Sequence, residues 1–159
     1  MKKTKHLILT FGIVILSVVA DQVTKIIAQE NLLDKGFVGI IGDAIGFELV
    51  YNPGAFLGMF SQTRWAFMIP SAIFIVLMIA WAFFKVSQHP LFTVSLGLLI
   101  GGGIGNMIDR IRLEYVIDFI SLKFINFPNF NVADSCVTIG CVLLAIYVLL
   151  PKHELFDFR

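Results

Sequence analysis

Four long apolar stretches constrain this sequence more than any other feature, because few folds can accommodate them. A helix needs roughly 20 residues to cross the hydrocarbon core of a bilayer. Stretches of this length and weak charge run over about residues 7–28, 65–84, 91–108 and 132–150. Hydrophobic residues make up 58% of the 159 residues and charged residues 14%, whereas about 25% is charged in a soluble domain. We therefore predict a single α-helical membrane domain, residues 1–159, with four transmembrane helices, and we exclude disorder, a coiled coil and most soluble enzymes.

The first stretch could instead be a cleaved signal peptide, because Lys2, Lys3 and Lys5 precede its apolar core. Cleavage sites carry small residues, and Val18-Val19-Ala20 lacks the first of them. Residues 21–29 also continue the helical pattern. We therefore expect this stretch to be retained as a membrane span.

The basic residues near the helix ends predict the orientation in the membrane. With four spans both termini share a side, and the twelve lysines and arginines then divide equally between the two sides. The basic cluster before the first helix breaks this tie, because the first helix usually sets the orientation. We expect both termini in the cytoplasm. Nine of the eleven acidic residues then fall on the outer side, so we expect any chemistry there.

Two outer segments connect the helices, over about residues 29–64 and 109–131. In the first, Phe47, Leu49 and Tyr51 alternate with other residues, which predicts a strand, and glycines punctuate the stretch before it. We expect a small curved sheet, a β-cradle, resting on the membrane. The second segment contributes aromatic residues suited to the membrane interface: Phe119, Phe124, Phe127 and Phe130.

The third stretch carries glycines at every fourth position, Gly97, Gly101 and Gly105, with Gly102 and Gly103 between them. This small-xxx-small pattern allows the backbone of a neighbouring helix to approach closely. A dinucleotide-binding loop does not fit, because the spacing differs from G-x-G-x-x-G and no strand precedes it. We predict helix packing at these glycines.

Charged residues near a span need a reason, because a charge at the bilayer centre costs roughly 2.5–3.5 kcal/mol on insertion scales. Two such groups share a helical face: Asp21, Thr24 and Lys25, and then Asn106, Asp109 and Arg110. Each could be an ordinary interfacial ion pair or a side chain that snorkels. Each could also line a site, where Arg110 could clamp a carbonyl or carboxylate. The residues alone leave both interpretations open.

Asp118 and Asp134 stand out as a pair. Asp118 lies between apolar residues, and Asp134 lies at the start of the fourth span. Singly, Asp118 could be a turn residue, and Asn131 or Asp134 a helix N-cap. Together on one surface of low dielectric, two carboxylates would share a proton, which is the state that aspartic proteases use. The topology allows the two to meet at the outer ends of the third and fourth helices.

The residues needed for other catalytic mechanisms or for a metal site are scarce on the outer side. His6, His89 and His153 all fall on the cytoplasmic side in this topology, so none can serve an outer nucleophile. Cys136 and Cys141 lie within the last apolar run and are interpreted as packing residues. A carboxylate metal site has no compact spacing.

The polar residues fall in four motifs that resemble those of the lipoprotein signal peptidases, or signal peptidase II. Asp21-Gln22-Val23-Thr24-Lys25 is similar to D-x-x-S/T-K, and the segment from Gly102 to Arg110 is similar to G-x-x-G-N-x-x-D-R. Val116-Ile117-Asp118-Phe119 resembles V-V/I-D-F, and the segment from Phe130 to Ser135 resembles F-N-x-A-D-S/A. The four occur in the family's order over nearly the whole chain.

The resemblance implies a four-helix aspartic endopeptidase of the bacterial inner membrane, with Asp118 and Asp134 as catalytic residues at the periplasmic face. Its substrates would be prolipoproteins that carry diacylglycerol on a cysteine and are cleaved just before that cysteine. No metal, organic cofactor or nucleic acid is implied, and we expect a monomer. The residues expected to line the site are Asn52, Gly54, Asn106, Arg110, Asn131, Asp21, Lys25, Asp109 and Ala133.

One motif departs from the family, which usually shows N-x-G followed by two small residues, an aromatic and a small one. Here the run is Asn52-Pro53-Gly54-Ala55-Phe56, so one small residue is missing and Pro53 stiffens the turn. One alternative is therefore a catalytically silent lipoprotein-binding paralogue, which would bind precursor without cleaving it. Another is a small ion or proton transporter, although the second and third spans carry no charge at depth.

Overall fold

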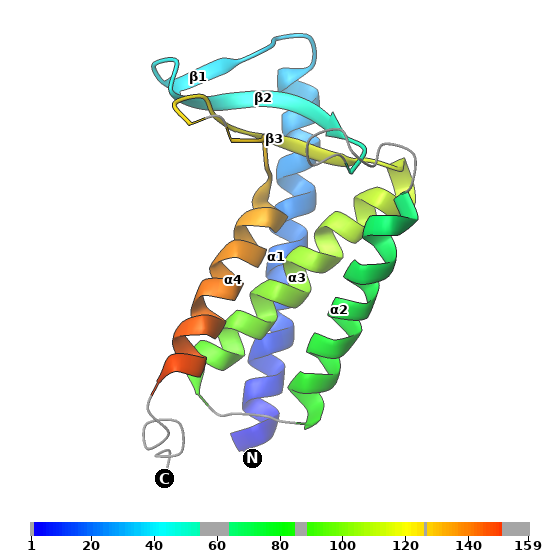
Figure 1. Cartoon of the computed structure of the whole chain (residues 1–159), viewed down its shortest axis with the longest axis vertical. Coiled ribbons are helices and arrows are strands. Elements are labelled where there is room, and N and C mark those ends of the chain that lie inside the picture. The colour runs from blue at the N-terminus through cyan, green and yellow to red at the C-terminus, as the bar shows by residue number, and fades with distance from the viewer. Residues whose placement is uncertain (1, 55–63, 85–88, 126, 151–159) are drawn as a thin grey trace.

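The computed structural model describes residues 2–54, 64–84, 89–125 and 127–150, which form four helices and three strands. The helices stand together as a bundle, and the strands lie across one end of it (Figure 1). Helix α1 begins and helix α4 ends at the opposite end of the bundle (Figure 1). The sheet end and the terminal end of the molecule are therefore distinct.

The four predicted helices are present. Their bounds are Lys2–Leu32 for α1, Arg64–Phe84 for α2, Pro90–Leu113 for α3 and Val132–Leu149 for α4. Among the described residues, three segments are long and apolar enough to cross a membrane, namely Thr4–Leu32, Pro90–Leu113 and Val132–Leu149. The apolar part of α2 is shorter, Met68–Phe84.

Helices α1 and α3 run beyond the ends predicted near residues 28 and 108. The last turns of α1 are retained because Ala28 and Leu32 are buried against Phe119 of the sheet. Helix α3 starts at Pro90, whose fixed backbone angle suits the first helical position. It ends where Glu114 adopts a left-handed conformation, with φ at 70°.

Helix α3 packs against α1 and α4 at distances that require glycine. A Cβ on Gly101 would lie 2.7 Å from the Cβ of Ser17 on α1. A Cβ on Gly102 would lie 2.5 Å from the carbonyl oxygen of Ala133 on α4. The prediction that these glycines serve helix packing is confirmed.

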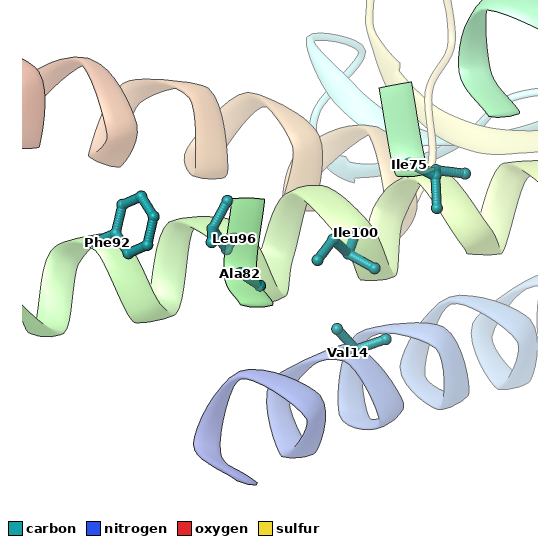
Figure 2. Packing of buried hydrophobic residues seen from close by; sticks show 6 residues of the cluster. All are labelled: Val14, Ile75, Ala82, Phe92, Leu96 and Ile100. Carbon is teal, nitrogen blue, oxygen red and sulfur yellow. The ribbon is translucent and has the colours of Figure 1, made fainter. Parts of the chain in front are cut away.

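The apolar core lies where α1, α2 and α3 meet. Figure 2 shows its buried members: Val14, Ile75, Ala82, Phe92, Leu96 and Ile100. Apolar side chains on the outside of the bundle are exposed, for example Leu16 at 69% and Val148 at 63%. An apolar surface of this kind suits contact with lipid.

The sheet has three antiparallel strands in the order β1-β2-β3, with bounds Val38–Ile41, Ile45–Asn52 and Val116–Leu122. The strand predicted around residues 47–52 is therefore present as β2. Phe47 and Leu49 were expected to face lipid, but they pack against the Ala28 and Leu32 cluster of α1. A register shift between Phe47 and Val50 separates them from Tyr51, which packs against Tyr115 at 4.9 Å between ring centroids.

Strand β3 was not predicted, because that segment was interpreted only as an aromatic interfacial stretch. Phe124 and Phe127 are exposed, at 60% and 54%, which suits an interfacial position. The interfacial interpretation is wrong for Phe119, which is 6% exposed and packs against Phe47 with 6.1 Å between ring centroids. β3 continues the sheet from β2 and carries Asp118, so the sheet holds part of the predicted site.

Candidate active site

Asp118 and Asp134 line the same cleft at the sheet end of the bundle. Asp118 lies in the middle of β3 and Asp134 in the first turn of α4. The cleft has a volume of about 570 Å³, and both aspartates and Asn52 contribute to its wall. The rest of the wall is mainly apolar, with Leu122, Ile125, Phe127, Pro128, Phe130 and Ile139 among its members. We call this cavity the carboxylate cleft.

Asp134 is held by the start of its own helix. Asn131 is the N-cap of α4, and its side-chain oxygen accepts the Asp134 N–H at 2.9 Å. In return, Oδ2 of Asp134 accepts the Asn131 N–H at 3.2 Å, which completes a capping box. Asn106 donates to the other oxygen, Oδ1, at 2.7 Å. Two donors therefore fix the orientation of this carboxylate at the start of the helix.

Asp118 has a different environment. It is 2% exposed, and its carboxylate accepts hydrogen bonds from Asn52 Nδ2 at 2.9 Å and from Asn131 Nδ2 at 2.7 Å. Burial raises the pKa of Asp118 to about 6, and the negative charge of Asp134 adds to this, while the bonds from Asn52 and Asn131 lower it. Asp118 therefore takes up a proton at a higher pH than an ordinary aspartate.

Asn131 connects the two carboxylates. Its side-chain nitrogen donates to Asp118, and its backbone N–H donates to Asp134. The same side-chain nitrogen lies 3.0 Å from Oδ1 of Asn106 and 3.3 Å from the carbonyl oxygen of Ile117. Asn131 is fully buried, at 0% exposure, so this geometry is fixed by the protein interior.

A layer of charged side chains lies behind Asn106, away from the cleft wall. Lys25 Nζ is 2.8 Å from Asp21 Oδ2 and 2.8 Å from Asp109 Oδ2, and it donates to Asn106 Oδ1 at 3.0 Å. Gln22 donates to Asp109 Oδ1 at 2.9 Å. Asp21, Lys25 and Asp109 are all at most 2% exposed, so this is a fully desolvated ion cluster.

Asn52 reaches Asp118 despite the unusual motif around it. The Asn52 side-chain oxygen accepts the N–H of Gly54 at 2.9 Å, which leaves its amide nitrogen free to donate to Asp118. Gly54 has φ at 101°, a conformation that favours glycine. The departing residues from Ala55 onward lie outside the described residues, so only Asn52, Pro53 and Gly54 of this motif are placed.

Arg110 lies on α3 within electrostatic range of Asp134, Asp118 and Asp109. Its Nη1 donates to the carbonyl oxygen of Asn106 at 3.4 Å. The guanidinium is thus beside the carboxylate pair, where it could also donate hydrogen bonds to a carbonyl or carboxylate group of a ligand.

Of the residues expected to line the site, Asn52 is part of the cavity wall, whereas Asn106 and Asn131 bond to the two aspartates without lining it. Asn52, Asp118 and Asp134 line the cavity itself. Asp21, Lys25, Asp109 and Ala133 lie in the buried layer behind it, and Ala133 is 0% exposed.

Three features of the site differ from the expectations drawn from the sequence. Thr24 shares a face with Asp21 by spacing, but its hydroxyl donates to the carbonyl oxygens of Ala20 and Asp21 in its own helix. Gln22, at a position that varies in the motif, joins the ion cluster instead. The apolar wall contributed by residues 122–130 was also missed, because nothing in its composition distinguishes it from an interfacial stretch.

The described part of the chain holds no group of three or more His, Cys, Asp or Glu side chains placed to bind a metal ion. The two carboxylates are each bonded to amide donors rather than aligned on a common ion position. The chemistry that this arrangement can perform is acid–base catalysis by a pair of carboxyl groups in unlike environments.

The protein is similar to known membrane enzymes over most of its length. Residues 13–150 match the family described as signal peptidase (SPase) II. A lipoprotein signal peptidase of Symbiobacterium thermophilum is 39% identical, with 92% of this chain and 97% of the relative covered. Another, of Lactococcus lactis subsp. lactis, is 37% identical over the same shares of the two chains.

Two solved structures are similar to this chain in fold. One, described as a bacterial membrane enzyme at 2.3 Å resolution, has a TM-score of 0.82 at 28% identity and covers 94% of this chain and 93% of its own. A second, a bacterial membrane enzyme at 1.9 Å, has a TM-score of 0.80 at 31% identity and covers 88% and 92%. Sequence and fold lead to the same conclusion, which is that this chain belongs to the signal peptidase II family.

Proposed function

We propose that the protein is an aspartic endopeptidase that removes signal peptides from lipoproteins, with Asp118 and Asp134 as its catalytic residues. The observation that carries the proposal is that both carboxylates line one cleft and are bridged by Asn131. Relatives at 39% and 37% identity are named lipoprotein signal peptidases, which supports the same substrate class here.

The unlike environments of the two aspartates suggest their roles. Asp118, whose pKa burial raises to about 6, acts as the acid, and Asp134, which accepts hydrogen bonds from Asn106 and from the backbone of Asn131, acts as the base. Asp134 takes a proton from a water as its oxygen attacks the scissile carbonyl carbon, and Asp118 gives its proton to the carbonyl oxygen. The resulting diol collapses when Asp134 returns its proton to the leaving nitrogen and Asp118 recovers its own. The carbon–nitrogen bond breaks, and the pair regains its starting protonation.

The side chains around the pair can hold the substrate. Asn52 and Arg110 lie next to the carboxylates and offer hydrogen-bond donors to a peptide backbone. The apolar wall formed by residues such as Leu122, Phe127 and Ile139 suits a hydrophobic signal helix and lipid chains. We propose that the substrate carries diacylglycerol on its cysteine, enters from the membrane, and is cut just before that cysteine. The site then faces the periplasm, with both termini in the cytoplasm of an inner-membrane protein.

A proteoliposome assay with a diacylglyceryl-modified precursor peptide tests the proposal. Wild-type protein should release the signal peptide, and Asp118→Asn and Asp134→Asn should each lower turnover by about 10³-fold or more, as loss of an essential acid or base does. The unlipidated peptide is the substrate control and should be cut poorly. Unchanged turnover in either variant would reject the carboxylate pair, and binding without cleavage by wild type would favour the silent paralogue.

A further inference from the structure

The ion cluster of Asp21, Lys25 and Asp109 has no part in the reaction proposed above, yet it is fully buried. Lys25 lies between the two aspartates at 2.8 Å from each, and all three side chains are at most 2% exposed. Burying charges in this way is costly, and apolar residues would often stabilise a fold better. The cluster therefore calls for an explanation beyond stability.

Each carboxylate of the cluster holds the backbone one residue before a catalytic candidate. Oδ1 of Asp21 accepts the N–H of Ala133 at 2.9 Å, and Ala133 directly precedes Asp134. Oδ2 of Asp109 accepts the N–H of Ile117 at 3.2 Å, and Ile117 directly precedes Asp118. These carboxylates belong to α1 and α3, so they tie the start of α4 and the middle of β3 to the same cation.

Lys25 makes a third connection, through Asn106. Its ammonium donates to Oδ1 of Asn106, and Nδ2 of Asn106 then donates to Asp134 at 2.7 Å. The opposite orientation of the amide would place its NH₂ group against the ammonium of Lys25 and against the donor nitrogen of Asn131. The charge of Lys25 therefore fixes which end of Asn106 faces Asp134.

We propose that Asp21, Lys25 and Asp109 are positioning residues, which set the separation and orientation of Asp118 and Asp134 by clamping the backbone just before each. The inference rests on the proposed function, because it concerns the same carboxylate pair. It assigns to the cluster a role in catalysis that operates entirely through other groups, without contact with substrate.

A matched pair of substitutions at Asp21 separates positioning from simple stability. Asp21→Asn and Asp21→Leu both remove the charge and leave Lys25 with Asp109, but only asparagine keeps an oxygen that can accept the Ala133 N–H. Asp21→Leu should lower kcat about 10²-fold, which is what a misplacement of about 1 Å costs, while KM changes by less than about threefold. Asp21→Asn should lower kcat by only about three- to tenfold, because the backbone contact survives.

Lys25→Met provides an electrostatic readout that a purely structural role would not give. Lys25 lowers the pKa of Asp118 through its charge, so its removal should shift the alkaline limb of the kcat/KM profile to higher pH. Leu96→Ala is the stability control, because Leu96 is a core residue at 1% exposure and remote from the carboxylates in the chain packing. It should lower the melting temperature while kcat per folded molecule and the pH profile stay as in wild type.

The outcomes separate the two proposals. Suppose that wild type cleaves and the Asp118 and Asp134 variants do not. The positioning role alone is then overturned if Asp21→Asn and Asp21→Leu have the kcat of wild type per folded molecule and the pH profile of Lys25→Met is not shifted. If the leucine and methionine variants do not fold, Asp21→Asn decides, and a wild-type kcat for that variant overturns the inference. If wild type fails to cleave, or the Asp118 and Asp134 variants still cleave, the proposed function itself fails.

Discussion

At the scale of single residues, the site depends on giving two identical side chains unlike surroundings. Asp118 is buried on a strand and bonded to side-chain amides, whereas Asp134 is bonded to Asn106 and to a backbone N–H at a helix start. Among the described residues, Asn52, Asn106 and Asn131 donate hydrogen bonds to these carboxylates, and of the three Asn52 bonds to Asp118 without contacting Asp134. It therefore offers a way to alter the pKa of Asp118 separately.

Asn52→Leu should move the alkaline limb of the kcat/KM profile to higher pH. The amide of Asn52 stabilises the charged form of Asp118 and so lowers its pKa. Without that bond the pKa rises above 6, and Asp118 keeps its catalytic proton over a wider range. A shift of about one unit is expected, because a hydrogen bond to a charged group is worth roughly 1.5–3 kcal/mol and one unit corresponds to about 1.4 kcal/mol.

The measurement is the pH dependence of cleavage from about pH 4 to 9, a range that spans the pKa of Asp118. Asp43→Asn is the matched control, since it removes an exposed carboxylate in the turn between β1 and β2, and its profile should equal that of wild type. An alkaline limb that stays in place, or moves to lower pH, in Asn52→Leu would contradict the assignment of the proton to Asp118.

At the scale of elements, the sequence predicted what local periodicity encodes. Helical length and apolarity predicted the four helices, and alternation predicted β2. Residue type predicted an N-cap at Asn131 or Asp134, and the structure has Asn131 in that position. Strand β3 could not be predicted from alternation, because its residues Val116 to Phe119 are buried on both faces of the sheet. Its partner, β2, is also distant in the chain, and such non-local pairing leaves no local pattern. Asp21, Lys25 and Asp109 were expected to line the site. Their contacts with the backbone of Ala133 and Ile117 depend on tertiary packing and could not be predicted from local sequence.

Gly102→Ala should disturb the site through the packing of α3 on α4. The added Cβ would lie 2.5 Å from the carbonyl oxygen of Ala133, and backbone cannot rotate away as a side chain can. The start of α4, which carries Asn131 and Asp134, must then move. We expect destabilisation of about 1–3 kcal/mol from overpacking and a fall in kcat of about tenfold or more from displacement of Asp134.

The neighbouring glycine gives a control for this substitution. A Cβ on Gly103 would meet the side chain of Ile75 at 2.9 Å, which belongs to α2 and not to α4. Gly103→Ala should therefore keep kcat within about twofold of wild type per folded molecule, since it does not move the catalytic groups. Equal losses of kcat in both variants, after correction for folded fraction by thermal melting, would show that α4 packing on Gly102 does not control the site.

At the scale of the whole molecule, the buried charged side chains of the described residues lie at one end of an apolar bundle. Strands β2 and β3 and the start of α4 meet at the sheet end (Figure 1), and residues of these elements line the carboxylate cleft. The outside of the helices is apolar and exposed, as lipid contact requires. This asymmetry favours a site at one end of the bundle over a path through it, because ion and proton paths carry ionisable groups through the depth of the membrane.

The orientation of this asymmetric bundle can be tested by labelling single cysteines from one side of the membrane. The basic cluster before α1 predicts a cytoplasmic N-terminus, so the sheet end should face outward. In a background with Cys136→Ser and Cys141→Ser, Asp43→Cys in the β1–β2 turn should react with an impermeant maleimide added to intact spheroplasts. Lys5→Cys, which lies near the start of α1 and is exposed, should react only after permeabilisation. The reverse pattern would place the carboxylate cleft on the cytoplasmic side, where a precursor's cysteine could not reach it after export, and the proposed substrate would then be wrong even if the catalytic pair were right.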